Sequence, residues 1–254
     1  MFSNLHNRSG PKQISNTYYK MSVIVSINVH EKPGFLMKQI ENISTHIQCK
    51  FTILLNCNDY MNDKLKSQPL PPNVVINPEI INKKHSTGTI TQGIYSNLCY
   101  ANKNYTYDFF IVLSSRNLFF RPITIDDILE VQKKFDAAHY KNPRWPFWPK
   151  MRNTALAKYY LERGSTLYRI AHEGLVFSHT VCQTIEKFMT DHPSIQNDTF
   201  KFPAFLEEFA LQTIAINEST VCPFVYIGRG ANETLLKPPT NDTIHFVYKT
   251  IRSE

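Results

Sequence analysis

The chain has 254 residues, of which 42% are hydrophobic and 13% aromatic, and its formal net charge is +7 at pH 7. A chain this long and this apolar can bury a sizeable core, which excludes an intrinsically disordered protein. Only 8 residues are glycine and no short repeat is present, which excludes a fibrous protein. No apolar run approaches the roughly 18 residues that a membrane span needs.

The amino-terminal segment differs from the rest of the chain. Residues 1–20 are polar and lack the apolar stretch of a signal peptide or an anchor, so we expect them to form a flexible arm. No linker-like composition divides residues 21–254, and we expect these to form a single domain.

The first half of the chain predicts strands that alternate with helices. Ser22–Val29 is rich in β-branched residues and almost wholly apolar, which is typical of a strand buried on both faces. Pro33 follows, at the position where the first turn of a helix favours proline. Thr89 and Gln92 have the spacing of a capping box, which predicts the start of another helix. Further strands are predicted at residues 51–57, 73–77 and 108–113.

This order of elements predicts an α/β fold with a mostly parallel central sheet that is flanked by helices. Ligands of such sheets bind beyond the carboxyl ends of the strands. The residues at these ends are polar here, which favours a binding site. They are Asn28 and His30 after the first strand, Asn58 after the second, and Ser115, Arg116 and Asn117 after the fourth.

The second half is predicted to hold shorter and more mixed elements. Residues 143–149 contain three prolines and both tryptophans, Trp145 and Trp148, which predicts a rigid and irregular loop. This loop could pack as an anchor or stack on the faces of sugars. Residues 204–216 predict a helix that carries Glu207 and Glu208. Helices are also predicted at residues 125–135 and 181–189, and strands at 175–177, 222–227 and 243–248.

Basic residues are concentrated in one segment. Residues 141–169 contain seven lysines and arginines against one acid, Glu162. Such a segment attracts phosphate groups, whether in a nucleotide, a nucleic acid or an anionic lipid. It could equally be a solvated basic helix surface.

Five cysteines are present, and none has the C-x-x-C spacing. Their odd number excludes a complete set of disulfides within the chain. Together with the polar amino-terminal segment, this favours the cytoplasm. Seven N-x-[ST] sequons keep the alternative open that the chain is a lumenal domain without its signal anchor.

Several common catalytic motifs are missing from the sequence. It has no phosphate-binding P-loop, no dinucleotide fingerprint and no G-x-S-x-G elbow. The nine histidines show no metal-ligand spacing, and no D-x-D occurs. Asp126 and Asp127 are adjacent and are best explained as charges at the start of a helix. We therefore expect neither a metal nor another cofactor.

Two acidic residues and one lysine are candidates for chemistry. Glu207 and Glu208 stand among aromatic and aliphatic neighbours, and an apolar environment raises the pKa of a carboxyl group, as general-base catalysis requires. The alternative is a solvated helix start. Lys249 follows an apolar segment and could place its ammonium group in a cleft, where cations can do the work of a metal on a diphosphate. It could also be an ordinary surface lysine.

Four segments carry a resemblance to one enzyme family. Residues 108–117 (DFFIVLSSRN) resemble a D-Y-F-I-x-L-S-G-x-D segment, and residues 87–102 resemble the turn and helix that precede it. Residues 207–213 (EEFALQT) resemble D-E-x-x-x-x-T, and residues 245–249 (HFVYK) resemble L-F-A-x-K-F. The segments occur in the family's order. The chain thus resembles the core-2/I-branching β-1,6-N-acetylglucosaminyltransferase-like family, which includes the peptide O-xylosyltransferases.

The resemblance implies a GT-A-like fold over residues 21–254 and an inverting, metal-independent glycosyltransferase. Such an enzyme moves a sugar from a nucleotide diphosphate sugar, here expected to be UDP-linked, to a hydroxyl of a glycan or glycoprotein. By resemblance, Glu208 is the catalytic base, and Lys249 and Arg229 hold the donor diphosphate. We further assign Asn28, His30, Asn58 and Arg252 to the donor, and Glu173, Ser115, Arg116, Trp145 and Trp148 to the acceptor.

The sequence departs from the family pattern at two places. Glu207 replaces the first aspartate of D-E-x-x-x-x-T, and Ser115, Arg116 and Asn117 replace Gly-x-Asp. These departures leave two alternatives open. One is a catalytically inactive carbohydrate-binding protein of the same fold, and the other is a nucleic-acid-binding protein that uses the basic segment, although we expect no nucleic acid partner.

Overall fold

The computed structural model describes residues 21–29, 32–84, 87–141, 144–204, 206–228, 234–235 and 245–250, with only the backbone at 234–235. The predicted arm at residues 1–20 lies outside this part of the chain.

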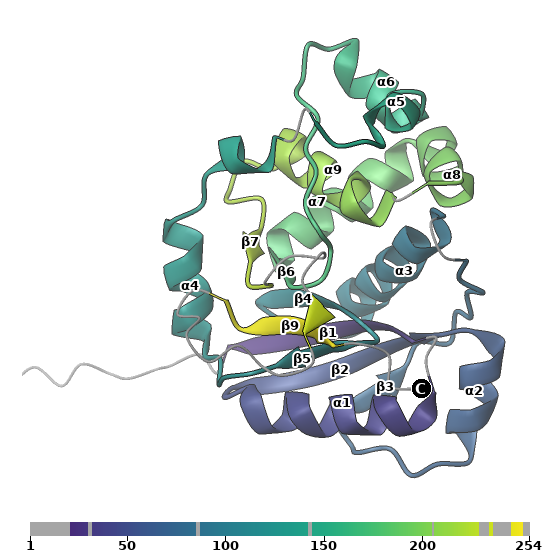
Figure 1. The fold of residues 1–254 in the computed structure, drawn as a ribbon, viewed down its shortest axis with the longest axis vertical. Helices are drawn as coiled ribbons and strands as arrows, with labels where there is room; N and C mark the ends of the chain where they lie inside the picture. The colour runs from purple at the N-terminus through teal and green to yellow at the C-terminus, as the bar shows by residue number, and fades with distance from the viewer. Residues whose placement is uncertain are drawn as a thin grey trace, which may run out of the picture.

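The described strands form a central sheet in the order β3-β2-β1-β4-β6-β7, which Figure 1 shows at the middle of the molecule. The first four strands of that order are parallel, as predicted, while β6 and β7 are each antiparallel to the strand before them. The bounds are β1 (Ser22–Val29), β2 (Lys50–Cys57), β3 (Val74–Ile76), β4 (Phe109–Ser114), β6 (Leu175–Ser178) and β7 (Val225–Tyr226).

Helices cover both faces of this sheet (Figure 1). The side chains of β1 alternate between two hydrophobic clusters, with Ile24 in one and Val23 and Val25 in the other. The cluster of Ile24 includes residues of α3 (Thr89–Asn104), α7 (His179–Asp191) and α9 (Ala210–Glu218). The other includes residues of α1 (Pro33–His46), α2 (Asp59–Lys66) and α4 (Ile125–Lys133). The fully apolar strands are therefore explained by burial on two sides.

Three further helices complete the second half of the described chain. They are α5 (Trp148–Met151), α6 (Ala155–Leu161) and α8 (Pro193–Lys201), and single 3₁₀ turns lie at η1 (Ala137–Tyr140) and η2 (Leu206–Glu208). No helix among the described residues combines the length and the apolar character needed to cross a bilayer.

Two predictions about helix starts were wrong. Thr89 is the first residue of α3 and does not cap it, because its hydroxyl accepts a hydrogen bond from the Lys84 N–H at 2.9 Å. The continuous helix predicted at 204–216 is interrupted, since Glu207 and Glu208 lie in η2 and Phe209 has non-helical angles before α9. A capping box does occur at α4, where Thr124 and Asp127 bond to each other's backbone.

A second, smaller sheet stands beside the carboxyl end of β4. Its order is β5 (Asn117–Phe119), β9 (Val247–Thr250) and β8 (Thr234–Leu235). Asn117 pairs with Lys249 across β5 and β9. This pairing carries Lys249, from near the end of the chain, to the edge of the central sheet.

Candidate functional site

The sheet order has a switch point between β1 and β4, and the region outside the carboxyl ends of these two strands is here called the crevice. After β1 the chain builds β2 and β3 on one side and then crosses to form β4 on the other side. Asn28 at the end of β1 pairs with Ser114 at the end of β4. Open α/β sheets bind ligands at such a switch point, outside the carboxyl ends of the strands. The site is therefore built from the residues around this pair.

Asn28 is fixed by the start of α3. Its Nδ2 donates to the Ile90 carbonyl at 2.9 Å, while its Oδ1 is buried with no hydrogen-bond partner among the described groups. A Cβ at Gly93 would lie 2.3 Å from that Oδ1 and 2.7 Å from Lys83 Cε. Only glycine therefore lets α3 approach β1 this closely.

Lys83 is a site residue that the sequence analysis missed. Its ammonium donates to the carbonyl oxygens of Asn56 at 2.9 Å and Ile81 at 3.2 Å, beside the end of β2. Burial lowers the pKa of Lys83 to about 8. No spacing or motif signals it, because only the fold carries the loop after β3 to this place.

The turn after β4 is a tightly bonded structural unit. Asn117 Oδ1 accepts from the Ser114 N–H at 2.7 Å, and Gln39 donates to the carbonyls of Ser114 and Asn117 at 2.8 Å each. Ser115 is buried, and the Arg116 carbonyl accepts from the Thr250 N–H at 3.0 Å. The segment that departs from the family pattern thus anchors β9 through its backbone.

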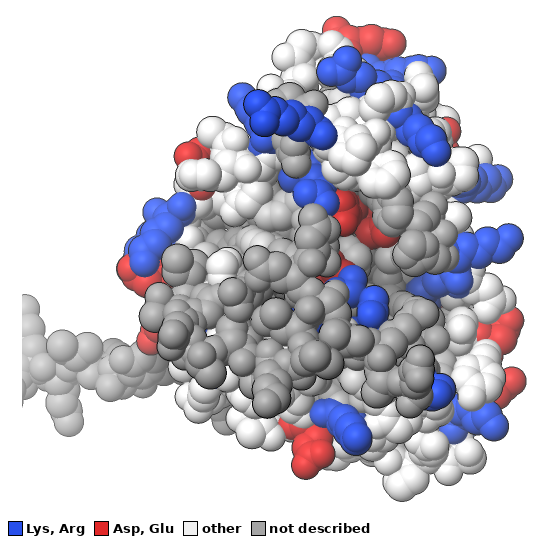
Figure 2. Space-filling model, viewed as in Figure 1, with Lys and Arg blue, Asp and Glu red and all other residues white. Residues whose placement is uncertain are grey.

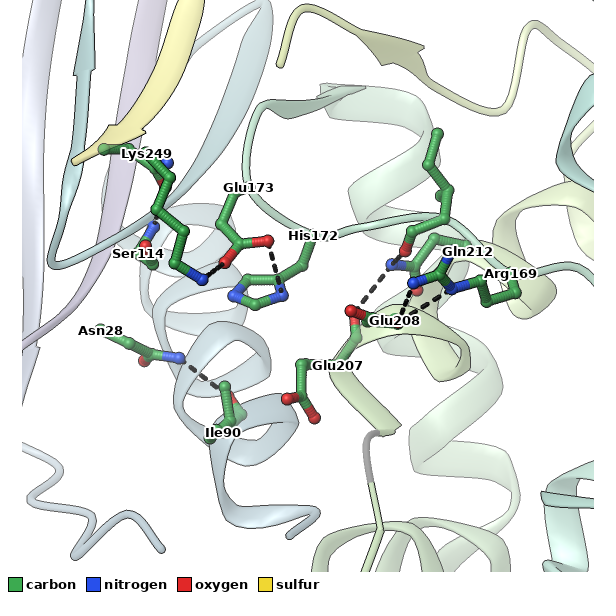
Figure 3. Close-up of polar contacts among 12 residues, drawn as sticks. Asn28, Ile90, Ser114, Arg169, His172, Glu173, Glu207, Glu208, Gln212 and Lys249 are labelled. Carbon is green, nitrogen blue, oxygen red and sulfur yellow. Dashed lines mark hydrogen bonds and ion pairs between the residues drawn. The ribbon is translucent and has the colours of Figure 1, made fainter. Parts of the chain in front are cut away.

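Lys249 forms an ion pair inside the crevice (Figure 3). Its Nζ lies 2.6 Å from Glu173 Oε1, and the side chains are 18% and 5% exposed. The other Glu173 oxygen, Oε2, lies 3.6 Å from His172 Nδ1. Burial raises the pKa of Glu173, but His172 and Lys249 outweigh it, so the pKa lies below the usual value. Glu173, assigned to the acceptor from sequence, here holds the lysine assigned to the donor.

Glu207 and Glu208 have very different surroundings, although they are adjacent. Glu208 Oε2 accepts from Arg169 Nε at 2.8 Å and from Arg169 Nη2 at 2.6 Å. Glu207 is only 6% exposed, and its Oε2 has no hydrogen-bond partner among the described groups. Burial, with smaller contributions from Glu208 and Glu173, raises the pKa of Glu207 to about 8. The environment expected to raise a carboxyl pKa therefore acts on Glu207.

Helix α9 holds these glutamates against the segment before Glu173. Gln212 Nε2 donates to the carbonyls of Glu207 at 2.8 Å and Ile170 at 3.1 Å, and the Ile170 N–H donates to the Glu208 carbonyl at 3.0 Å. Thr213, the last residue of the D-E-x-x-x-x-T-like segment, donates to the Tyr168 carbonyl at 3.2 Å. The segment therefore fixes both glutamates relative to Arg169.

The two tryptophans lie in the core, which corrects the expectation that they stack on acceptor sugars. Trp145 and Trp148 are 4% and 8% exposed and pack edge to face on each other. Trp148 also packs on Phe209, and the guanidinium of Arg169 lies 5.5 Å from the centre of the Trp145 ring. This packing supports Arg169 and the glutamate segment, and Trp148 also lines a cavity of about 310 Å³.

Of the remaining predicted residues, one is a helix cap and three lie outside the described residues. Asn58 caps α2, because its side-chain oxygen accepts from the Met61 N–H at 2.9 Å. His30, Arg229 and Arg252 are not among the described residues. The structure thus brings Asn28, Glu173, Glu207, Glu208 and Lys249 to one crevice (Figure 3).

Acidic and basic side chains meet at the centre of the face shown in Figure 2. No group of three potential metal ligands occurs among the described residues.

The sequence matches no protein-family model, and no curated protein matches it significantly. What the crevice offers is a set of carboxylates and cations, suited to proton transfer and to binding an anion.

Proposed function

We propose that the chain is an inverting glycosyltransferase with a GT-A-like fold, which moves a sugar from a nucleotide diphosphate sugar to an acceptor hydroxyl. One observation carries this proposal. The switch point of the sheet brings Lys249 into the same crevice as Glu207 and Glu208, although these residues come from separate segments. The resemblance of the 207–213 and 245–249 segments to family motifs points to the same residues.

Glu208 is the proposed general base. Both hydrogen bonds from Arg169 reach Oε2, and among the described residues none donates to Oε1. The second oxygen is therefore available to an acceptor hydroxyl, while arginine fixes the direction of the carboxylate. A base that a third group orients in this way is a common arrangement for activating a nucleophile.

In the reaction, Glu208 takes the proton of the acceptor hydroxyl. The hydroxyl oxygen forms a bond to the anomeric carbon as the bond from that carbon to the diphosphate breaks, on the opposite face of the sugar. The electron pair of the broken bond goes to the diphosphate. Lys249 stabilises this charge, which requires its ammonium to turn from Glu173 to the phosphate oxygens.

Glu207 is assigned a different task from Glu208. With a pKa of about 8 it is mostly protonated at pH 7, so it can donate a hydrogen bond to a sugar or phosphate oxygen. A carboxyl group kept neutral by burial does not repel the incoming diphosphate.

The test is a titration of the protein with nucleotide diphosphates and their sugars, in EDTA and in Mn²⁺. We expect UDP or a related nucleotide to bind equally in both, and Lys249→Ala to weaken binding about 10- to 100-fold. Failure of every nucleotide to bind would contradict the proposal. Nucleotide-sugar binding without transfer to any acceptor would instead support an inactive carbohydrate-binding protein.

A further inference from the structure

A separate cavity lies against the first turn of α3. It has a volume of about 420 Å³ and is bounded by the loop before α3, the start of α3 and the end of α8. Thr89 and Gln92, which share a face of the helix, line it. Ile90 and Gly93, on the neighbouring face, contact Asn28 in the crevice. One helical turn therefore forms a wall of both spaces.

The cavity is built by close packing of two backbone segments. The Gly88 N–H donates to the Phe202 carbonyl at 2.9 Å, which joins the start of α3 to the end of α8. A Cβ at Gly88 would lie 1.8 Å from the Thr199 carbonyl oxygen, so no other residue fits there without displacing the backbone. The Phe200 ring is also supported, with its centre 5.5 Å from that of Tyr95. The walls are thus fixed before any ligand binds.

The lining has the chemistry of a site for a charged sugar. The amides of Gln92 and Asn197 supply donors and acceptors, and Phe200 supplies a partly exposed aromatic surface. Two exposed lysines, Lys84 and Lys201, supply positive charge from opposite elements. None of the described lining residues is acidic. Neutral polyols need no such pair of cations, whereas a carboxylate or sulfate does.

We propose that this cavity binds an acidic sugar unit of the acceptor glycan, with its anionic group between Lys84 and Lys201 and its ring on Phe200. The inference rests on the proposed function, because the shared turn of α3 places such a unit beside the crevice where transfer would occur. The site would select acceptors that carry a carboxylated or sulfated sugar next to the unit that receives the new sugar.

Direct binding tests this without turnover. The probes are a disaccharide that ends in glucuronic acid, the same disaccharide with the carboxylate reduced to an alcohol, and inorganic sulfate. Two exposed cations predict that the acidic disaccharide binds about tenfold more tightly than the reduced one in low salt. Binding is measured by calorimetry. Equal affinity for the two disaccharides, or sulfate binding as tight as that of the acidic disaccharide, would overturn the proposal.

Variants locate the site. Lys84→Gln with Lys201→Gln should abolish the preference for the acidic disaccharide, and Phe200→Leu should weaken the binding of both disaccharides. The charge-matched control is Lys38→Gln with Lys103→Gln, at exposed lysines of α1 and the far end of α3, and it should keep the preference. Thermal unfolding of each variant checks that it folds. A preference that survives in the Lys84 and Lys201 double variant would refute the assignment.

The same probes separate this inference from the proposed function. Lys249→Ala should leave the affinity for the acidic disaccharide unchanged, because Lys249 does not line the cavity and is proposed to bind the donor only. If no nucleotide binds but the acidic disaccharide still binds through Lys84 and Lys201, the transferase proposal fails and the cavity stands. If nucleotides bind and the preference for the acidic disaccharide is absent, the proposal for the cavity fails and the transferase proposal stands.

Discussion

Two carboxylate–cation pairs lie in the crevice, and they differ in the number of their contacts and in their exposure to solvent. Arg169 grips Glu208 through two nitrogens on one oxygen, and both side chains keep some exposure, at 20% and 14%. Lys249 meets Glu173 through a single contact, with Glu173 only 5% exposed. The planar guanidinium fixes an orientation, whereas the ammonium is a point charge on a flexible stem.

In the proposed reaction, these two ion pairs would serve different steps. A carboxylate that accepts protons has to be aimed, and the arginine does so. A cation that receives a leaving group has to be released when the diphosphate arrives, and a lysine can rotate away from its partner. Neutralising the carboxylate is thus expected to lower turnover in the Glu208 pair and to strengthen nucleotide binding in the Glu173 pair.

Neutralising Glu208 should have the largest effect. Glu208→Gln removes the proposed base while keeping the shape of the side chain, so turnover should fall roughly 10²–10⁴-fold with little change in nucleotide affinity. Steady-state transfer rates and a nucleotide titration measure the two quantities. Glu130→Gln, on the surface of α4, is the control. A Glu208→Gln protein with full turnover would show that another group is the base.

Arg169→Lys should have the next largest effect. It keeps the charge but not the two-nitrogen grip on Oε2, so the carboxylate loses its direction, and kcat should fall about 10- to 100-fold. The KM for the donor should stay near the wild-type value. If KM rises and kcat is retained, Arg169 contacts the donor and does not position Glu208.

Neutralising Glu173 should instead strengthen the binding of a nucleotide. Glu173→Gln removes the carboxylate that competes with the diphosphate for Lys249, so the Kd for a nucleoside diphosphate should decrease about tenfold. The same change leaves a largely buried cation without its partner, so the Tm should drop. Calorimetry and thermal unfolding measure the two effects. Weaker nucleotide binding would mean that Glu173 itself positions Lys249 for the ligand.

The smallest effect on activity should come from Glu207. At pH 7 Glu207→Gln mimics the neutral carboxyl, so turnover should change less than about tenfold. The effect on stability depends on pH. The folded-state pKa of about 8 exceeds the unfolded value near 4.5, so the stability from Glu207 is present at low pH and is lost as pH rises from about 4.5 to 8.

Urea denaturation between pH 5 and pH 8.5 tests this. The free energy of unfolding of the wild type should fall over that range by more than that of Glu207→Gln, because each tenfold change in a protonation equilibrium is worth about 1.4 kcal/mol. Equal slopes for the two proteins would show that Glu207 ionises normally in the folded state.

The central sheet could be predicted because its signals are local. Ser22–Val29 forms β1 with the predicted bounds, since an unbroken apolar β-branched segment needs burial on two faces. Helix α2 was missed, because residues 59–66 have few apolar positions and rely on the Asn58 cap. The capping box at Thr89 was misjudged, because the backbone of Gly88 packs on α8 and the Thr89 hydroxyl bonds to the preceding loop.

The candidate site could be predicted only in part, because its partners are distant in sequence. The 207–213 segment pointed to Glu207 and Glu208, but nothing in it names Arg169 as the partner of Glu208. The raised pKa belongs to the glutamate that is buried. Glu207 and Glu208 are adjacent in η2, but their burial differs, and the sequence does not show this. The role of the tryptophans was inferred from the proline-rich segment that contains them. Their packing beside Arg169 depends on the tertiary structure.

The placement of Lys249 on β9 also has a consequence for synthesis. The ribosome releases β1 to β4, Arg169 and both glutamates well before β9, because β9 comes near the end of the described chain. A nascent chain can therefore complete its central sheet while β5, which begins at Asn117, still lacks its partner strand β9. Until β9 docks, such a chain has Glu173 without Lys249, so the proposed ability to hold a diphosphate would come only with β9.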